Sequence, residues 1–219
     1  MIFLSISFFA FRCEEDKSPE FVFMIFELPF NVTPGNDYIN VGDTLWITSE
    51  IPDTIHEYYS GDYYKIVNFD FSFSLGIRKL VSGGFNFGDQ PGATAQFNFI
   101  QEIGSIPFFG ETFSDFKLVY INEKYVSKIG IIPQSTGVYC LNFLGPSQLE
   151  LKSVTDLGRT LDGRQRIPAY ETLFFIINGG NNNLSLLREN CILSSDSNPN
   201  NYRAFYYEQK GTFTFRVVE

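Results

Sequence analysis

Strict alternation of apolar and polar residues is the feature of this sequence that most limits its fold. It is clearest over 69–75, where three Phe and a Leu alternate with Asp and two Ser, and it recurs over 212–217. Successive side chains of a strand point to opposite faces of a sheet, so this pattern collects the aromatic rings on one face. The alternation predicts strands that are buried on one side and in contact with water on the other.

Further runs rich in Phe, Tyr, Ile, Val and Thr predict additional strands, because these residues suit a pleated, half-buried surface. The runs cover 21–28, 45–49, 97–99, 116–121, 125–132, 138–144 and 173–177. Turn-forming residues separate them, and a helix is predicted only over 184–189, after a run of asparagines. We therefore expect an all-β fold: an antiparallel β-sandwich, immunoglobulin-like or jelly-roll-like, with at most one or two short helices.

Composition excludes several classes of function. The chain has 16 Lys and Arg against 25 Asp and Glu, a net charge of −9, whereas a nucleic-acid-binding protein needs a basic face. Its single histidine excludes a multi-histidine metal site. The sequence contains neither a glycine-rich phosphate loop before a helix nor a C-x-x-C motif. We therefore expect no nucleic-acid partner, no metal and no cofactor.

The amino terminus has the pattern of an export signal. Residues 2–11 are apolar apart from two serines, too short to span a bilayer but typical of the apolar region of a signal peptide. Cys13 follows, and then Glu14, Glu15 and Asp16. The pattern resembles a bacterial lipoprotein signal, and its acidic stretch resembles the surface-export signal of Bacteroidota lipoproteins. The resemblance implies a signal peptide over 1–12, lipid on Cys13 and an acidic tether over 13–20.

A second resemblance lies in the step V-G-D-T-L-W-I over 41–47. It resembles the entry to the second strand of bacterial immunoglobulin-like sandwiches, in which Gly42 would form a tight turn and Trp46 would enter the core. The whole chain resembles the surface lipoproteins of Bacteroidota. We expect a single domain over 21–219, with the polar stretch 145–166 as a long surface loop or a subdomain boundary.

The cysteine count has two interpretations. If Cys13 carries lipid, Cys140 and Cys191 remain, and an even remainder in an exported protein indicates one disulfide. The alternative is a pair of buried thiols that pack as small hydrophobic groups. Tyr139 and Leu141 belong to the heavier apolar face of their strand, so we expect Cys140 on the opposite face.

The best candidate for binding is a tyrosine-rich turn. Tyr58, Tyr59, Tyr63 and Tyr64 flank the turn around Gly61. Exposed tyrosines offer flat apolar faces and a hydroxyl, which suit a sugar ring or a protein surface. The alternative is that these side chains cap the core at a hairpin.

Two threonines match a modification triplet. Thr44 and Thr54 each follow Asp and precede an apolar residue, which resembles the O-glycosylation signal of Bacteroidota. The resemblance implies that these two hydroxyls accept glycan.

No catalytic residue is predicted. His56 lies near Asp53 and Ser60, but no G-x-S-x-G motif accompanies it, so it is interpreted as a surface histidine. Residues 196–201 resemble the start of a calcium loop, but Asn201 stands where such a loop needs Gly. That segment is interpreted as an Asx-rich hairpin loop.

These features together predict a binding or structural protein, not an enzyme, that is lipid-anchored at the outer membrane or cell surface. It would be an accessory subunit of an outer-membrane complex or a module that binds protein or glycan. The alternatives are an exported enzyme acting on polysaccharide, whose two carboxylates would lie in a cleft, and a secreted adhesin without lipid.

Overall fold

The computed structural model describes residues 18–59, 61, 63–65, 71–81, 83, 86–107, 109–145, 161–198 and 200–219, without the side chains of 65, 168–172 and 202. The predicted signal peptide, Cys13 and most of the tether lie outside the described residues. So do 146–160, within the predicted loop or subdomain boundary.

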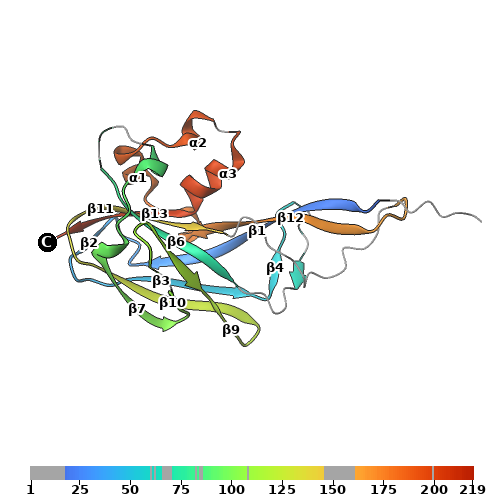
Figure 1. Cartoon of the computed structure of the whole chain (residues 1–219), viewed down its shortest axis with the longest axis horizontal. Helices are drawn as coiled ribbons and strands as arrows, with labels where there is room; N and C mark the ends of the chain where they lie inside the picture. The colour runs from blue at the N-terminus through green and yellow to red at the C-terminus, as the bar shows by residue number, and fades with distance from the viewer. Residues whose placement is uncertain are drawn as a thin grey trace, which may run out of the picture.

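Thirteen strands form in the described chain, as the alternating sequence predicts. They are β1 (Glu20–Thr33), β2 (Tyr38–Asn40), β3 (Leu45–Pro52), β4 (Thr54–His56), β5 (Tyr63–Lys65), β6 (Ser72–Lys79), β7 (Phe97–Ile103), β8 (Phe113–Lys117), β9 (Val119–Ile121), β10 (Lys124–Pro133), β11 (Gly137–Leu144), β12 (Arg166–Ile177) and β13 (Thr212–Val218). Figure 1 shows the strands of the two larger sheets as two layers, with the short helices above one of the layers.

The chain is an all-β sandwich, which confirms the predicted fold class. One sheet has the order β12-β1-β3-β10-β7 with β9 beside β10, the other has the order β2-β13-β11-β6-β8, and β4 and β5 form a separate hairpin. Most strand pairs are antiparallel, as expected, but β1–β12 and β2–β13 are parallel. These two pairs join strands far apart in the sequence, so no tight turn forces them to run in opposite directions.

An aromatic core joins the two sheets. The side chain of Phe30 in β1 is fully buried and packs on four other phenylalanine rings, with ring centroids 4.6–6.2 Å away. Those rings come from β6, β8, β11 and β12: Phe73, Phe116, Phe143 and Phe175. The aromatic face predicted by the alternation is therefore the core of the sandwich.

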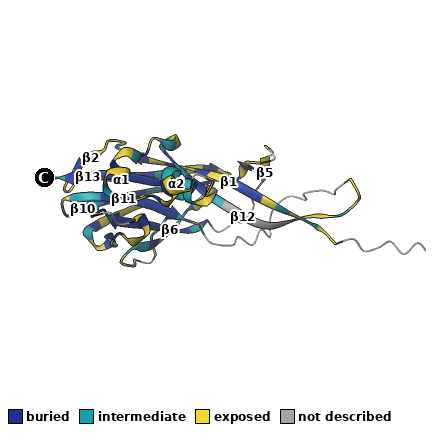
Figure 2. Ribbon diagram, turned by 90° about the horizontal axis from the view of Figure 1, so that it is seen from above, coloured by how far each residue is buried: buried dark blue, intermediate teal, exposed yellow. Residues whose placement is uncertain are grey.

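Strand β1 extends beyond this core. Its partner β12 follows it from Glu20 to Phe30 in parallel register, and the two strands form a ribbon that projects past the rest of the sandwich (Figure 1). Figure 2 shows that exposed residues gather at the far end of this ribbon while the strands of the sandwich are buried. Phe21 and Phe23 on the ribbon are exposed to 60% and 61%.

Short helices cover part of the sandwich. They are α1 (Leu184–Asn190), α2 (Ser194–Ser197), α3 (Tyr202–Ala204) and a π-helix, η4 (Phe205–Lys210), and 3-10 turns form at η1 (Phe87–Asp89), η2 (Thr94–Gln96) and η3 (Asn178–Gly180). The predicted helix over 184–189 is confirmed as α1, whereas three α-helices exceed the one or two expected. No described helix is long and apolar enough to cross a membrane.

The expectation for Trp46 is wrong. Leu45 and Ile47 are fully buried in the core, and alternation along β3 therefore directs Trp46 to the outer face of the sheet. There the ring lies over Gly130, where an added Cβ would come within 3.1 Å of it, and the Lys128 ammonium lies 4.7 Å from the ring centroid. The tryptophan is half-buried.

Cys140 and Cys191 are free thiols, so the structure corrects the predicted disulfide. Both are buried in a second, smaller cluster of apolar side chains on the outer face of β11, which includes Phe87 and Leu187. The prediction that Cys140 lies opposite Tyr139 and Leu141 is confirmed, because those residues belong to the main core. Each thiol packs there as a small hydrophobic group.

Burial protects both thiols from electrophiles. It raises the pKa of Cys140 to about 12 and, with a smaller effect of the charge of Glu208, the pKa of Cys191 to about 11. We predict that iodoacetamide at pH 8 leaves both cysteines unmodified in the folded protein, because the thiolate is the reactive form. Urea without reductant should make both reactive, as followed by peptide mass spectrometry. Resistance in urea that only a reductant relieves would instead show a disulfide.

Candidate functional site

Among the described residues, the two most exposed aromatic side chains lie on one hairpin. Tyr59 and Tyr63 are exposed to 66% and 70%, and Tyr58 to 43%. These three residues form the aromatic hairpin surface, carried by β4, β5 and the turn between them. The hairpin lies beside β1, because Glu57 forms a bridge with Phe26 and the Tyr58 amide donates to the Ile25 carbonyl over 2.8 Å.

A buried carboxylate holds this hairpin. Glu57 is 3% exposed, and its two oxygens accept the backbone amides of Ile25 at 2.8 Å and Tyr59 at 3.0 Å. The Gly61 amide donates to the Glu57 carbonyl over 3.0 Å, and Gly61 has a φ of +72°, which glycine adopts without strain. These contacts hold the backbone of Glu57, Tyr58 and Tyr59 against β1.

The π-helix η4 supports the same surface from within. Its Tyr206 packs edge-on against Tyr58 with ring centroids 6.3 Å apart, and stacks on Phe174 of β12 at 4.1 Å. The Tyr206 hydroxyl donates to the Glu27 carboxylate over 2.7 Å. Tyr58 therefore rests on a buried aromatic pair that belongs to the frame of the sandwich.

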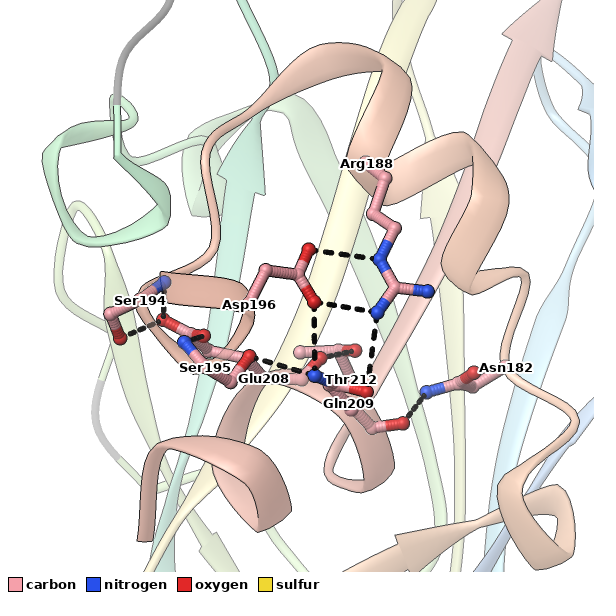
Figure 3. A network of polar contacts seen from close by, with 8 residues as sticks. All are labelled: Asn182, Arg188, Ser194, Ser195, Asp196, Glu208, Gln209 and Thr212. Carbon is pink, nitrogen blue, oxygen red and sulfur yellow. Dashed lines mark hydrogen bonds and ion pairs between the residues drawn. The ribbon is translucent and has the colours of Figure 1, made fainter. Parts of the chain in front are cut away.

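A polar network in turn holds η4 in place (Figure 3). The Glu208 carboxylate, 6% exposed, accepts the Ser194 amide at 3.1 Å, the Ser194 hydroxyl at 2.6 Å and the Ser195 amide at 2.8 Å. These amides begin α2 and have no partner within that helix. The Thr212 hydroxyl donates to the Glu208 carbonyl over 2.7 Å. Glu208 thus ties η4 to α2 and to the start of β13.

An exposed ion pair completes the network. Arg188 of α1 binds the Asp196 carboxylate with two hydrogen bonds, of 2.9 and 2.6 Å, and lowers the pKa of Asp196. The Gln209 amide donates to the same carboxylate over 3.2 Å. Asp196 and Ser197 lie in α2, whereas Asn198, Asn200 and Asn201 lie outside any helix or strand, so the interpretation of 196–201 as a hairpin loop is wrong for its first two residues. The Asp196 carboxylate is engaged by a guanidinium that competes with any cation.

The structure separates the four predicted tyrosines. Tyr58, Tyr59 and Tyr63 are exposed, as the binding interpretation requires, whereas Tyr64 is half-buried and packs edge-on against Phe26 at 6.1 Å. For Tyr64 the alternative, a side chain capping the core, is the correct one, because alternation along β5 directs adjacent residues to opposite sides. Tyr64 is therefore removed from the candidate surface.

The remaining candidates lie apart from this surface or beside it. His56 is exposed, with its ring 5.3 Å from that of Tyr63.

Asp53 is buried and accepts the hydroxyls of Tyr120 at 2.8 Å and Thr54 at 3.2 Å. The hydrogen bond to Asp53 raises the pKa of Tyr120 to about 12. Thr54 is exposed at the start of β4, and Thr44 is half-buried in the turn before β3. Ser60 lies outside the described residues.

Sequence reasoning missed the two buried carboxylates. Glu57 and Glu208 resemble ordinary charged residues in the sequence. The contact of Glu57 that ties the hairpin to β1, with Ile25, spans 32 positions, and the contacts of Glu208 with Ser194 and Ser195 span 13–14. A local pattern such as a capping box spans only three residues, so it contains no signal for either contact. The one hint in the sequence was that each glutamate lies next to a pair of tyrosines.

The fold and this surface together define a class of protein. It is a β-sandwich with an exposed aromatic hairpin that the contacts of Glu57 and Tyr206 hold in place. Neither a scan against protein-family models nor a search of curated proteins finds a match to this chain. The surface presents apolar ring faces with hydroxyls at their edges.

We predict that Glu208→Gln destabilises the protein by about 2–3 kcal/mol, because the new amide group places a donor against the donors of Ser194 and Ser195. Urea unfolding followed by circular dichroism measures the change. Glu189→Gln is the matched control, since Glu189 is exposed on α1 and should change stability by less than about 0.5 kcal/mol. Equal stability of the two variants would show that the buried carboxylate does not hold η4.

Proposed function

We propose that this protein is a non-catalytic, lipid-anchored binding protein of the outer membrane or cell surface, and that it holds a partner protein through the aromatic hairpin surface. Its role would be that of an accessory subunit of an outer-membrane complex. The observation that carries the proposal is the exposure of Tyr59 and Tyr63 on a hairpin whose backbone is held by a buried glutamate.

The composition of this surface favours a protein partner. Tyrosine is enriched in protein interfaces and among the residues that contribute most to binding. Ordering a mobile loop on binding costs free energy, and the contacts of Glu57 and Tyr206 lower that cost in advance. The hairpin should therefore bind with little rearrangement.

The lipid anchor is supported by the lipoprotein-type signal that ends at Cys13. Strand β1 begins at Glu20, so 20 − 13 leaves seven residues of tether, which span at most about 25 Å when extended. In this proposal the ribbon that carries Phe21 and Phe23 stays close to the membrane. Anchoring in one plane raises the effective concentration of the protein for a membrane-embedded partner.

We predict that the double variant Tyr59→Ser/Tyr63→Ser weakens partner binding by roughly tenfold or more, because truncating interface tyrosines removes their buried contact area. The measurement is affinity purification from detergent-solubilised envelopes of the native host, with a tag after Glu219 and quantitative mass spectrometry.

Tyr38→Ser is the matched control, because Tyr38 is also a tyrosine, is 60% exposed and lies on β2 at the other end of the sandwich. It should recover the same proteins in the same amounts as the unmodified chain. Equal recovery by all three proteins, or recovery of this chain alone, would refute the hairpin as a protein-binding surface.

We predict that Cys13→Ala moves the protein from the membrane fraction to the soluble fraction, because the acyl chains that hold it in the bilayer are lost. Fractionation includes a carbonate wash, which strips proteins held only by other proteins. Ser18→Ala, a change in the same tether, should leave the protein in the membrane. Retention of Cys13→Ala after the wash would rule out the anchor.

A further inference from the structure

A second surface lies on the outer face of the larger sheet. A groove of about 770 Å³ is lined by residues of β1, β3, β7, β9 and β10. Across its floor the strand register sets Asn31 of β1 beside Thr48 of β3, then Lys128 of β10, then Ile103 of β7. The volume lies in the range of small-ligand sites in proteins.

The groove is charged but its charges cancel. The Lys124 ammonium lies 2.9 Å from the Glu50 carboxylate, and the Lys128 ammonium lies 2.6 Å from that of Glu102. Each cation of the groove therefore has a carboxylate partner in place. A charged ligand would have to displace one of these partners, whereas a neutral ligand leaves both ion pairs intact.

The groove also offers uncharged hydrogen-bonding groups. Within the described chain, the side chains of Asn31, Thr48 and Asn122 form no hydrogen bond with another protein group. An amide donates and accepts, and so does a hydroxyl. Apolar side chains lie between them, among them Val126 and Pro29. Such alternation of polar and apolar groups matches a ligand with hydroxyls at its edges and C–H groups on its faces.

Trp46 borders the groove on the same face of β3, two residues from Thr48. An added Cβ at Gly130 would lie 3.1 Å from its ring, and the ammonium of Lys128, a residue of the groove, lies 4.7 Å from the ring centroid. Trp46 is the single tryptophan of the chain. Because its indole contacts Lys128 of the groove, Trp46 fluorescence gives a spectroscopic signal from a single residue beside this site.

We propose that this groove binds a neutral oligosaccharide. The paired charges disfavour acidic and basic ligands, the free amides and hydroxyl suit sugar hydroxyls, and the apolar side chains Pro29, Ile103 and Val126 suit the C–H faces of sugar rings. The inference uses other residues than the aromatic hairpin surface and does not rest on the proposed function.

The test titrates the purified full-length protein with neutral hexasaccharides of glucose, mannose, xylose and galactose, and with acidic hexagalacturonate as comparison. The readout is Trp46 emission, with calorimetry for the dissociation constant. We expect a saturable change with at least one neutral ligand and a dissociation constant at least about tenfold weaker for the acidic one.

The double variant Asn31→Ala/Thr48→Val removes two hydrogen-bonding groups from the floor of the groove and should weaken binding by about tenfold. Asn98→Ala is the matched control, because Asn98 is an exposed asparagine of β7 outside the groove, and it should bind like the unmodified protein. The proposal is overturned if no neutral oligosaccharide changes Trp46 emission, if the double variant binds as well as the control, or if hexagalacturonate binds equally tightly.

Discussion

Contact of one phenylalanine with four others holds the two sheets together, and the rest of the molecule depends on it. Phe30 lies where β1 crosses the core, and rings from both sheets surround it. Because β1 is fixed there, its amino-terminal half can extend beyond the core with β12 as its partner. The hairpin of tyrosines is attached to that half, so both exposed aromatic regions depend on the same buried ring.

Outside the core, two buried carboxylates hold the hairpin and the short helices in place. In an acidic chain most glutamates face water, yet Glu57 and Glu208 are buried and accept backbone amides that have no partner in a strand or helix. A buried backbone amide without a hydrogen-bond partner destabilises the folded state. The two glutamates supply that partner, so these amides are buried without this cost. The hairpin and the helical cover are therefore ordered by electrostatics, while the sandwich is ordered by packing. Tyr206 joins the two regions through its contacts with Tyr58 and Glu27.

The two candidate surfaces differ in chemistry. The hairpin presents tyrosine rings and lies beside the amino-terminal ribbon, whereas the groove over β3 and β10 presents amides, a hydroxyl and paired charges. A protein that binds one partner through rings and another through hydroxyl-matching groups can link the two. Sequence reasoning selected four hairpin tyrosines, of which three are exposed, because aromatic residues around a glycine turn are a local pattern. It did not find the groove, whose row of Asn31, Thr48 and Lys128 exists only through the register of three strands.

What the sequence by itself determined is local. Period-2 alternation determined which residues face the core, the asparagine run preceded α1, and the alternation around Tyr139 and Leu141 predicted the outward direction of Cys140. Trp46 shows the limit, because Leu45, Trp46 and Ile47 are all apolar and the pattern could not say which face is inside. Only the tertiary structure decided that face, the two parallel pairs and the partners of Glu57 and Glu208. The physical reason is that burial and strand pairing are set by contacts between segments far apart in the chain, which no local window contains.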